Sequence, residues 1–373
     1  MAKLGEVCKV SPSTKNIERQ GAWLLNLDMV EQQTGRVVEY NFVGEDGLNG
    51  SITQFDTENV LYSKLRPNLN KVVLPERDGF CTSELLPLRP DARKLDRSYL
   101  AVFLRSDGFV NWAVSKTAGA KMPRLGTKDL MNAEIPVPNI ERQKEIAEKF
   151  KKLEQLISLR KQQLAKLDEL AKARFVEMFG DISNSRKVPM QDVCKIITDG
   201  THQPPKFVLS GIPFLFVSNI VTNEIHYDAE KFISEETYNE LIKRTPIEVG
   251  DVLLSTVGSY GHPAVVKENK PFCFQRHIAY LKPNNSVVNS EYLRCAILST
   301  DLQRQIDESV KGIAQKTLNL SEIRKLRLPL PSLSLQNQFA AFVERIDQQK
   351  QTVQQSLEKL EVMKKALMQE YFG

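Results

Sequence analysis

The chain has 373 residues, of which 26% are charged, and a formal net charge of +5 at pH 7. Its apolar runs fall short of the about 18 residues that a membrane-spanning helix needs, and the N-terminal stretch lacks the apolar core of a signal peptide, so we expect neither a membrane span nor export. Five cysteines without the spacing of a disulfide framework or of metal ligands predict buried thiols in a reducing cytoplasm.

Residues 1–138 are predicted to form a mixed α/β domain. A β-rich run at 71–74 and a helical segment near 97–115 are separated by stretches that contain Gly, Pro, Asn and Asp. The length of the whole chain allows two or three such domains. The mildly basic charge permits nucleic-acid binding but does not argue strongly for it, so any such interpretation depends on local clusters.

Two loops of this first domain are rich in cationic and amide side chains. Such side chains reach the base edges and phosphates of DNA, with Arg forking onto guanine and Asn onto adenine. Ordinary solvated turns have the same composition, so the loops alone leave both interpretations open. The candidate DNA-binding residues are Lys64, Arg66, Asn68 and Asn70 in the first loop, and Lys121 and Arg124 in the second.

Residues 139–180 are predicted to form one long helix. Pro136 and Pro138 impose an extended approach, and Asn139 is the expected N-cap. Apolar residues then recur at alternating spacings of four and three, which is the 3.5-residue period of a coiled coil. The residues expected to pack against another helix are Leu153, Ile157, Leu164 and Leu167.

Residues 181–331 are predicted to form a second α/β domain. Strands are expected at 213–217 and 252–254, and helices near 235–243 and 290–309. Three polar loops again supply candidate DNA-binding residues, and the same reservation about solvated turns applies to them. These candidates are Thr201, His202, Ser259, Tyr260, Gln315 and Lys316.

The last segment, residues 332–373, repeats the first helix. Residues 119–180 align with 312–373 without a gap, so that the Pro-x-Pro phrases coincide, Gln143 falls on Gln336, and Phe179-Gly180 falls on Phe372-Gly373. A repeat fixes the architecture before any other signal. Two similar domains, each followed by one helix, predict approximate two-fold symmetry and antiparallel helices. The second helix is expected to pack through Ile346, Val353, Leu357 and Leu360, with Ser332 as its N-cap.

Two features of the helices allow two interpretations each. The leucines outside the packing seam either pack on the adjacent domain or form a docking face for another subunit; they are Leu156, Leu159 and Leu170. The cations on the seam either fix the register of the two helices or are solvated flanks. They are Arg160, Arg174, Lys350 and Lys364.

No catalytic or metal-binding residue is predicted. The histidines stand at 202, 226, 262 and 277, all in the second half, whereas a base used by both repeats would occur in both. There is no Gly-x-Ser-x-Gly nucleophile elbow and no His/Cys pair with metal-ligand spacing. Gly258 and Gly261 are not followed by the Lys-Ser/Thr of a phosphate-binding loop.

The order of these elements resembles the specificity (S) subunit of Type I restriction–modification enzymes. The resemblance covers essentially the whole chain. It is carried by the duplicated Pro-x-Pro phrases with a glutamine five residues later, the Asp199-Gly200-Thr201-His202 stretch that opens the second domain, and the Phe-Gly that closes each repeat. The single motifs are short, but their order and duplication are specific.

The resemblance implies a mixed α/β fold with two globular target recognition domains separated by two long antiparallel helices. It implies target recognition domains at 1–138 and 181–331, with spacer helices at 139–180 and 332–373. Each domain of such a protein reads one half of a bipartite, asymmetric double-stranded DNA target. The helices set the spacing and dock two methyltransferase (M) subunits, which bring S-adenosylmethionine, while restriction (R) subunits bring ATP and Mg. The chain itself would bind no cofactor and catalyse no reaction.

One departure limits the transfer between halves, because the first domain has no Asp-Gly-Thr-His near Cys8. The corresponding loop must be built differently there. The competing interpretation is a coiled-coil scaffold that binds proteins and has no DNA specificity. A single-chain restriction enzyme is excluded by the lack of room for catalytic domains and of their motifs.

Overall fold

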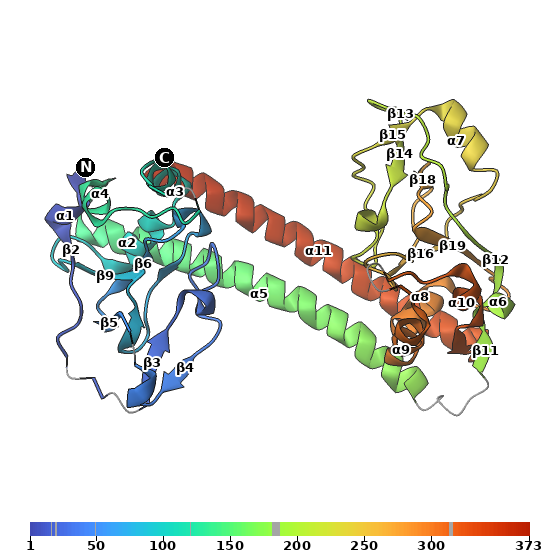
Figure 1. Ribbon diagram of the computed structural model, residues 1–373, viewed down its shortest axis with the longest axis horizontal. Helices are drawn as coiled ribbons and strands as arrows, with labels where there is room; N and C mark the ends of the chain where they lie inside the picture. Colours follow the sequence, from blue (N-terminus) through green and yellow to red (C-terminus); the bar gives the residue numbers. More distant parts are fainter. Residues whose placement is uncertain (16, 19–20, 49, 120, 181–186, 313–315) are drawn as a thin grey trace. The chain divides into compact units, whose positions relative to one another are not determined.

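The computed structural model describes residues 1–15, 17–18, 21–48, 50–119, 121–180, 187–312 and 316–373. The chain folds into two compact units (Figure 1). Unit 1 consists of Met1–Gln162 and Gln354–Gly373, and unit 2 of Gln163–Val353. Each unit therefore includes a segment of both long helices. The predicted boundaries at 138, 180 and 331 stay predictions.

The described residues of unit 1 form two four-stranded sheets and a short two-stranded one. The first sheet has the order β2-β9-β6-β7, with Cys8–Val10, Leu85–Pro90, Val60–Ser63 and Val72–Val73. The second has the order β4-β3-β8-β5, with Asn41–Val43, Ala22–Leu25, Gly79–Thr82 and Ile52–Phe55. Strands β3 and β8 run parallel, and the other pairs are antiparallel. Strand β1 (Ala2–Lys3) pairs with β10 (Glu134–Ile135), which ties the N-terminus to the end of the domain.

The helices of unit 1 are α1 (Leu4–Val7), α2 (Arg97–Leu104), α3 (Asp107–Ser115), α4 (Thr127–Asn132) and the first part of α5 (Ile140–Phe179). The predicted single helix near 97–115 is two helices, because Ser106 caps the second one by accepting a hydrogen bond from Phe109 N at 3.3 Å. Helices α2 and α3 share one buried core with β6, β9 and α5, which contains Tyr62, Leu88, Phe103, Phe109 and Phe150.

Unit 2 repeats the strand order of the first sheet and the short two-stranded pairing, whereas its second sheet has a different strand order. Its first sheet has the order β12-β19-β16-β17, with Cys194–Asp199, Ile278–Pro283, Val252–Ser255 and Pro263–Val265. The second has the order β13-β15-β14-β18, with Phe207–Val208, Phe232–Ile233, Ile212–Leu215 and Cys273–Phe274. Strand β11 (Lys187–Pro189) pairs with β20 (Arg327–Pro329), as β1 does with β10.

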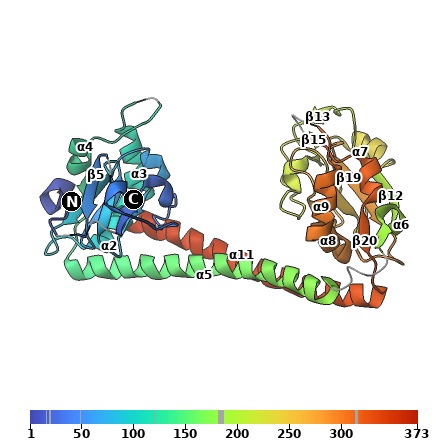
Figure 2. The ribbon, with the colours of Figure 1, turned by 60° about the horizontal axis from the view of Figure 1, so that its bottom comes forward.

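The helices of unit 2 are α6 (Met190–Val193), α7 (Glu235–Leu241), α8 (Ser290–Leu298), α9 (Thr300–Ser309), α10 (Leu320–Lys325) and part of α11 (Leu333–Phe372). Figure 2 shows α8 and α9 beside strand β19, and one core joins these helices to that sheet. The predicted helix near 290–309 is again divided, here at Ser299, whose hydroxyl accepts from Leu302 N at 3.4 Å. The predicted strand 213–217 ends early, since a short 3-10 helix (Val217–Asn219) follows β14.

Both N-caps of the long helices are confirmed. The Asn139 side chain accepts a hydrogen bond from Arg142 N at 2.8 Å, and the Ser332 hydroxyl accepts one from Leu335 N at 3.4 Å. These bonds satisfy backbone donors that the first turn of a helix leaves free. Tyr99 and Tyr292 then fix the extended segment before each helix, donating to Pro136 O at 2.8 Å and to Pro329 O at 2.6 Å.

The long helices pack antiparallel within each unit. In unit 1, Glu154 on α5 pairs with Lys364 on α11 at 2.9 Å, and Lys161 pairs with Glu361 at 3.4 Å. In unit 2, Asp168 pairs with Lys350 at 2.9 Å, and Leu167, Ile346 and Val353 form one buried cluster. The partner number falls as the α5 number rises, as antiparallel packing requires. Lys350 and Lys364 are thus ion-paired across the helices and are not solvated flanks.

All eight predicted packing residues are buried or half-buried, and Leu164, Leu167, Ile346 and Val353 form one cluster between the helices. The buried ones are Leu153, Leu167, Ile346, Val353 and Leu357, and the half-buried ones are Ile157, Leu164 and Leu360. The leucines outside the seam behave differently, because Leu156, Leu159 and Leu170 are 46%, 58% and 48% exposed. None of the three belongs to a core cluster of the described residues, which favours the docking-face interpretation.

Candidate nucleic-acid interface

Three segments of unit 1 meet where strand β6 ends. Lys64 N donates to Glu84 O at 3.0 Å, and Leu125 N donates to Lys64 O at 2.9 Å. Arg66 N donates to Pro123 O at 2.8 Å. The backbone thus joins the loop after β6, the turn between β8 and β9, and the loop before α4. We call these segments, residues 64–71, 83–84, 116–119 and 121–126, the loop frame of unit 1.

Unit 2 has the same frame. Thr256 N donates to His277 O at 2.9 Å, Leu318 N donates to Thr256 O at 2.8 Å, and Gly258 N donates to Lys316 O at 3.3 Å. Each donor and acceptor occupies the repeat-equivalent position of its counterpart in unit 1. The loop frame of unit 2 consists of residues 256–262, 275–277, 311–312 and 316–319. Because the bonds are backbone bonds, the frame does not depend on the side chains that it carries.

The side chains on the two frames are chemically different. Lys64, Arg66, Glu84 and Arg124 of unit 1 are replaced at the equivalent positions of unit 2 by Thr256, Gly258, His277 and Thr317. Unit 1 therefore presents three cations and one carboxylate where unit 2 presents two hydroxyls, one imidazole and no side chain. A common backbone with different hydrogen-bonding groups can select different base edges.

Arg66 is held in an unfavourable backbone conformation. Its φ is 49°, in the left-handed region, and the equivalent Gly258 has a φ of 73°. Glycine adopts this region freely, whereas another L-residue is disfavoured there by about 1–2 kcal/mol. The frame demands the left-handed turn in both units, yet unit 1 places an exposed arginine on it. Strain of this kind concentrates at functional sites.

Arg124 is braced by Glu84. The guanidinium contacts the carboxylate through Nε, at 3.3 Å from Oε2, and through Nη2, at 3.2 Å from Oε1. The arginine side chain is 47% exposed and the glutamate side chain is 25% exposed. Two other candidates in unit 1, Asn68 and Lys121, are also exposed.

Asn70 is turned inward. It is only 6% exposed, and its amide nitrogen donates to Gln33 Oε1 at 3.2 Å and to Arg105 O at 3.1 Å. The side chain therefore holds the loop against its neighbours. The base contact expected for Asn70 needs a different conformation, because the amide is used inside the unit.

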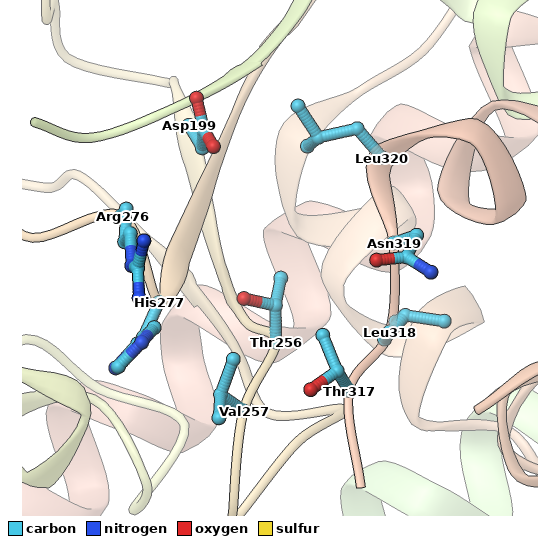
Figure 3. Close-up of a pocket in the computed structure, with 9 residues that line it drawn as sticks. All are labelled: Asp199, Thr256, Val257, Arg276, His277, Thr317, Leu318, Asn319 and Leu320. Atoms are coloured by element: carbon cyan, nitrogen blue, oxygen red, sulfur yellow. The ribbon is translucent and has the colours of Figure 1, made fainter. Parts of the chain in front are cut away.

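A cavity of about 420 Å³ opens on the frame of unit 2 (Figure 3). Figure 3 shows Arg276 and His277 on one side and Thr317 and Asn319 on the other, with Thr256 between them. Burial and the neighbouring Arg276 lower the pKa of His277 below its usual value, so the imidazole is neutral at pH 7 and offers both a donor and an acceptor. The wall of this cavity therefore offers both hydrogen-bond donors and hydrogen-bond acceptors.

Asp199 stands at the upper edge of this cavity (Figure 3). It pairs with Arg244 at 2.6 Å and with His202 Nε2 at 2.8 Å. The residue after it must be glycine, because a Cβ on Gly200 would lie 2.2 Å from Phe274 O. This close approach lets Thr201 N donate to Phe274 O at 3.1 Å, which pins the Asp-Gly-Thr-His loop beside the β18–β19 turn.

The remaining candidates of unit 2 differ in availability. Ser259, His202 and Lys316 are exposed, and Thr201 is half-buried with its hydroxyl donating to Gln203 O at 3.1 Å. Tyr260 donates to Asp307 at 3.0 Å, so its hydroxyl already has an acceptor. Gln315 lies outside the described residues.

The sequence interpretation missed Glu84, Arg276 and Asn319, as well as Arg244. Glu84 and Arg276 lie in the short turns β8–β9 and β18–β19, which look like ordinary hairpin connections. The internal repeat was the sequence signal that could have identified these two turns. The Phe80-Cys81 and Phe272-Cys273 pairs align, and the turns that follow them carry acidic and basic residues, respectively.

No metal site or membrane span is found within the described ranges. No group of three or more His, Cys, Asp or Glu side chains gathers there to hold a metal ion, and none of the helices is long and apolar enough to cross a bilayer. Burial raises the pKa of Cys8, Cys81, Cys194 and Cys273 to about 12. These sulfurs therefore stay protonated thiols, as expected for core residues.

Comparison with known proteins agrees with this architecture. The chain is 30% identical over 124 residues to the Type I restriction enzyme EcoDI specificity subunit of Escherichia coli, covering 33% of this chain and 27% of that protein. It is 23% identical over 269 residues to the EcoBI specificity subunit of the same species, covering 64% and 56%. The match to the MjaVIII specificity subunit of Methanocaldococcus jannaschii is 20% over 323 residues, covering 81% and 75%. The chain thus matches about a quarter and about half of the two E. coli proteins.

Solved structures share the fold. The S subunit of a Type I restriction–modification system from M. genitalium has a TM-score of 0.57 at 17% identity, with 100% of this chain and 95% of that chain covered. A chain from work on complex assembly and conformational transition of the type I R-M system has a TM-score of 0.56 at 20% identity, with 100% and 96% covered. The predicted fold class is confirmed.

A family model covers both halves of the chain. The family is described as the Type I restriction modification DNA specificity domain, and it matches residues 2–169 and 183–362. Each match covers one copy of the α/β domain and most of the long helix that follows it. The chain belongs to the family of Type I restriction modification DNA specificity domains.

Proposed function

We propose that this chain is the DNA-recognition subunit of a Type I restriction–modification enzyme. Each domain reads one half of a bipartite, asymmetric double-stranded target, and the two long helices set the distance between the halves. The observation that carries the proposal is the duplicated loop frame: the same backbone bonds hold Lys64, Glu84 and Arg124 in one unit and Thr256, His277 and Thr317 in the other. Because the two loop frames have the same backbone but carry different hydrogen-bonding side chains, they suit two different half-sites.

The partners follow from the same proposal. The exposed Leu156, Leu159 and Leu170 on α5 offer apolar area to a methyltransferase (M) subunit. The resemblance to S subunits implies that two such subunits dock on the helices. Those subunits would bring S-adenosylmethionine, and restriction (R) subunits would bring ATP and Mg. The chain itself works without a cofactor and without catalysis, in the cytoplasm.

A coiled-coil scaffold without DNA specificity is the competing function. The family match supports DNA recognition and not the scaffold. The two functions differ in one measurable respect: a scaffold binds no DNA in a salt-dependent manner, whereas a reader that neutralises phosphates loses affinity steeply as the salt concentration rises.

A domain exchange tests the proposal. Residues 181–323 are replaced by the matching segment of another family member, and the chain is expressed with its cognate methyltransferase subunits. Sequencing of methylated DNA should show one half of the motif changed and the other half and the spacing retained. Exchange of 1–138 should change the opposite half. If either exchange altered both halves together, or if the unmodified chain directed no methylation to a bipartite motif, the proposal would fail.

The isolated chain gives a second test. We expect no methyl transfer from S-adenosylmethionine, no DNA cleavage and no ATP hydrolysis without partner subunits. Methyl transfer by the purified chain alone would contradict the assignment of catalysis to the partners.

A further inference from the structure

We infer that Arg124, braced by Glu84, is the specificity-determining residue of the first domain and reads a guanine in its half-site; this inference rests on the function proposed above. Arg124 lies on the loop frame of unit 1, where Leu125 N is bonded to Lys64 O and Pro123 O to Arg66 N. The backbone on both sides of the arginine is therefore fixed, and only the side chain can adapt.

The ion pair leaves free the edge of the guanidinium that can bind a guanine. A guanidinium has five N–H donors arranged as a fork. Glu84 takes the side edge of Arg124, through Nε at 3.3 Å and Nη2 at 3.2 Å. The end edge, formed by Nη1 and the second hydrogen of Nη2, remains for another acceptor pair. Two parallel donors match O6 and N7 of guanine, whereas adenine offers one acceptor and one donor in the same places.

The brace also orders the guanidinium before DNA binds. A free arginine loses rotamer freedom when it binds, while one already held by a carboxylate loses less. The Arg124 side chain is 47% exposed and thus accessible, whereas the Glu84 side chain is only 25% exposed. Partly exposed ion pairs contribute little to stability, so the pair is not needed to keep the unit folded.

Unit 2 shows that the frame does not require this pair. The equivalent positions hold His277 and Thr317, which line the 420 Å³ cavity together with Arg276. The frame bonds are nevertheless the same in both units. The Glu84–Arg124 pair is thus an addition to the frame of the first domain, and its loss should affect only the half-site which that domain reads.

The chain provides a matched control within the same domain. Arg93 pairs with Asp91 in the same side-on manner, with Nε at 3.3 Å from Oδ1 and Nη2 at 3.5 Å from Oδ2. Asp91 follows the end of the six-residue strand β9, whereas Glu84 precedes its start. At about 3.4 Å per residue, the seven steps from Glu84 to Asp91 span about 24 Å, so Arg93 is far from the loop frame.

The experiment compares four variants in the complex with the cognate methyltransferase subunits: Arg124→Ala, Arg124→Lys, Glu84→Gln and Arg93→Ala. The motif and the methylation rates on duplexes with single base-pair changes are measured. We expect Arg124→Ala to reduce discrimination at one G·C pair of the first domain's half-site by about 10- to 100-fold. Arg124→Lys should restore affinity but not discrimination, because an ammonium cannot fork. Glu84→Gln should reduce the discrimination in part, and Arg93→Ala should leave it unchanged.

The outcomes separate this inference from the function on which it rests. The unmodified chain and Arg124→Ala could both direct methylation to the same bipartite motif with equal discrimination between base pairs. That result would overturn this inference and leave the proposed function intact. Equal losses of discrimination in both half-sites, or a loss caused by Arg93→Ala as well, would also overturn it, because they indicate a general effect on folding. Absence of any methylated motif with the unmodified chain would overturn the proposed function and this inference together.

Discussion

Gln143 and Gln336 make the same three hydrogen bonds in their respective units. Gln143 Oε1 accepts from Asp96 N at 2.8 Å, and its amide nitrogen donates to Lys94 O at 2.9 Å and to Pro138 O at 2.8 Å. Gln336 accepts from Asn289 N at 2.9 Å and donates to Val287 O at 3.2 Å and Pro331 O at 2.9 Å. Both side chains are fully buried. Each glutamine thus fastens the first turn of a long helix to its globular domain.

Gln143→Ala should destabilise unit 1. The substitution leaves one backbone N–H and two carbonyl groups without a partner, and an unsatisfied buried group costs about 1–3 kcal/mol. We expect the free energy of unfolding to fall by about 2–4 kcal/mol. Urea unfolding of the variant measures this change. The control is Gln155→Ala, at an exposed position of the same helix, which should change the free energy little.

Phe179→Ala should destabilise unit 2. The ring is 3% exposed and lies with its centroid 4.9 Å from Tyr292 and 5.4 Å from Phe339. Loss of a buried phenylalanine costs about 3–5 kcal/mol through lost transfer energy and the cavity left behind. Thermal unfolding checks this value, with Val176→Ala as the control, since Val176 is 64% exposed on the same helix. Equal effects of the two substitutions would contradict the packing described here.

Arg66→Gly should separate stability from DNA binding. Glycine relieves the left-handed backbone at φ 49° but makes the unfolded chain more flexible, so the free energy of unfolding should stay equal or rise by up to about 1 kcal/mol. Affinity for target DNA should nevertheless fall, because a cation at the frame is lost. Calorimetry and a DNA titration measure the two effects. A fall in both would show that Arg66 acts mainly in folding.

Lys316→Ala should weaken DNA binding without changing its sequence preference. Lys316 is exposed on the frame of unit 2 and supplies one positive charge. A lysine that contacts one phosphate contributes about one unit to the slope of log K against log salt concentration. Titrations of target and non-target duplexes at several salt concentrations should therefore show a parallel loss. A loss confined to the target sequence would assign Lys316 to base reading instead.

Asp56 should make unit 1 sensitive to acid. Burial by itself raises the pKa of Asp56, but hydrogen bonds from Arg89 at 2.6 Å and Ser13 at 2.7 Å outweigh it and hold the pKa below its usual value. A lowered pKa in the folded state contributes stability above the unfolded-state value of about 3.9, which is lost as the pH falls further. The stability advantage of the native chain over Asp56→Asn should thus shrink between about pH 5 and pH 2. Urea midpoints across this range measure it, and a constant difference would exclude the linkage.

Local sequence patterns predicted the bounds of the long helices well, but they predicted the conformation of the loops poorly. The long helices span Ile140–Phe179 and Leu333–Phe372, close to the predicted 139–180 and 332–373, because a 3.5-residue period over so many turns has no alternative. The breaks at Ser106 and Ser299 were missed, since apolar residues continue on both sides of each serine and hide the cap. For Asn70, composition suggested an exposed side chain, and only the contacts with Gln33 and Arg105 show that it is buried.

The sequence by itself determined the repeat, the two capped helices, the absence of catalytic motifs and the family, because these depend on residues that are close together or that recur at a fixed distance. Only the tertiary structure decided which domain core receives the C-terminal end of each long helix. Phe179 packs against Tyr292 in unit 2, and Phe372 packs against Tyr99 and Phe103 in unit 1, so each helix finishes in the core of the domain that it does not follow. The same holds for Glu84 and Arg124, which are 40 residues apart and become neighbours through backbone bonds across the loop frame. Contacts over such separations are set by packing and hydrogen-bond satisfaction in the whole fold, and no local pattern encodes them.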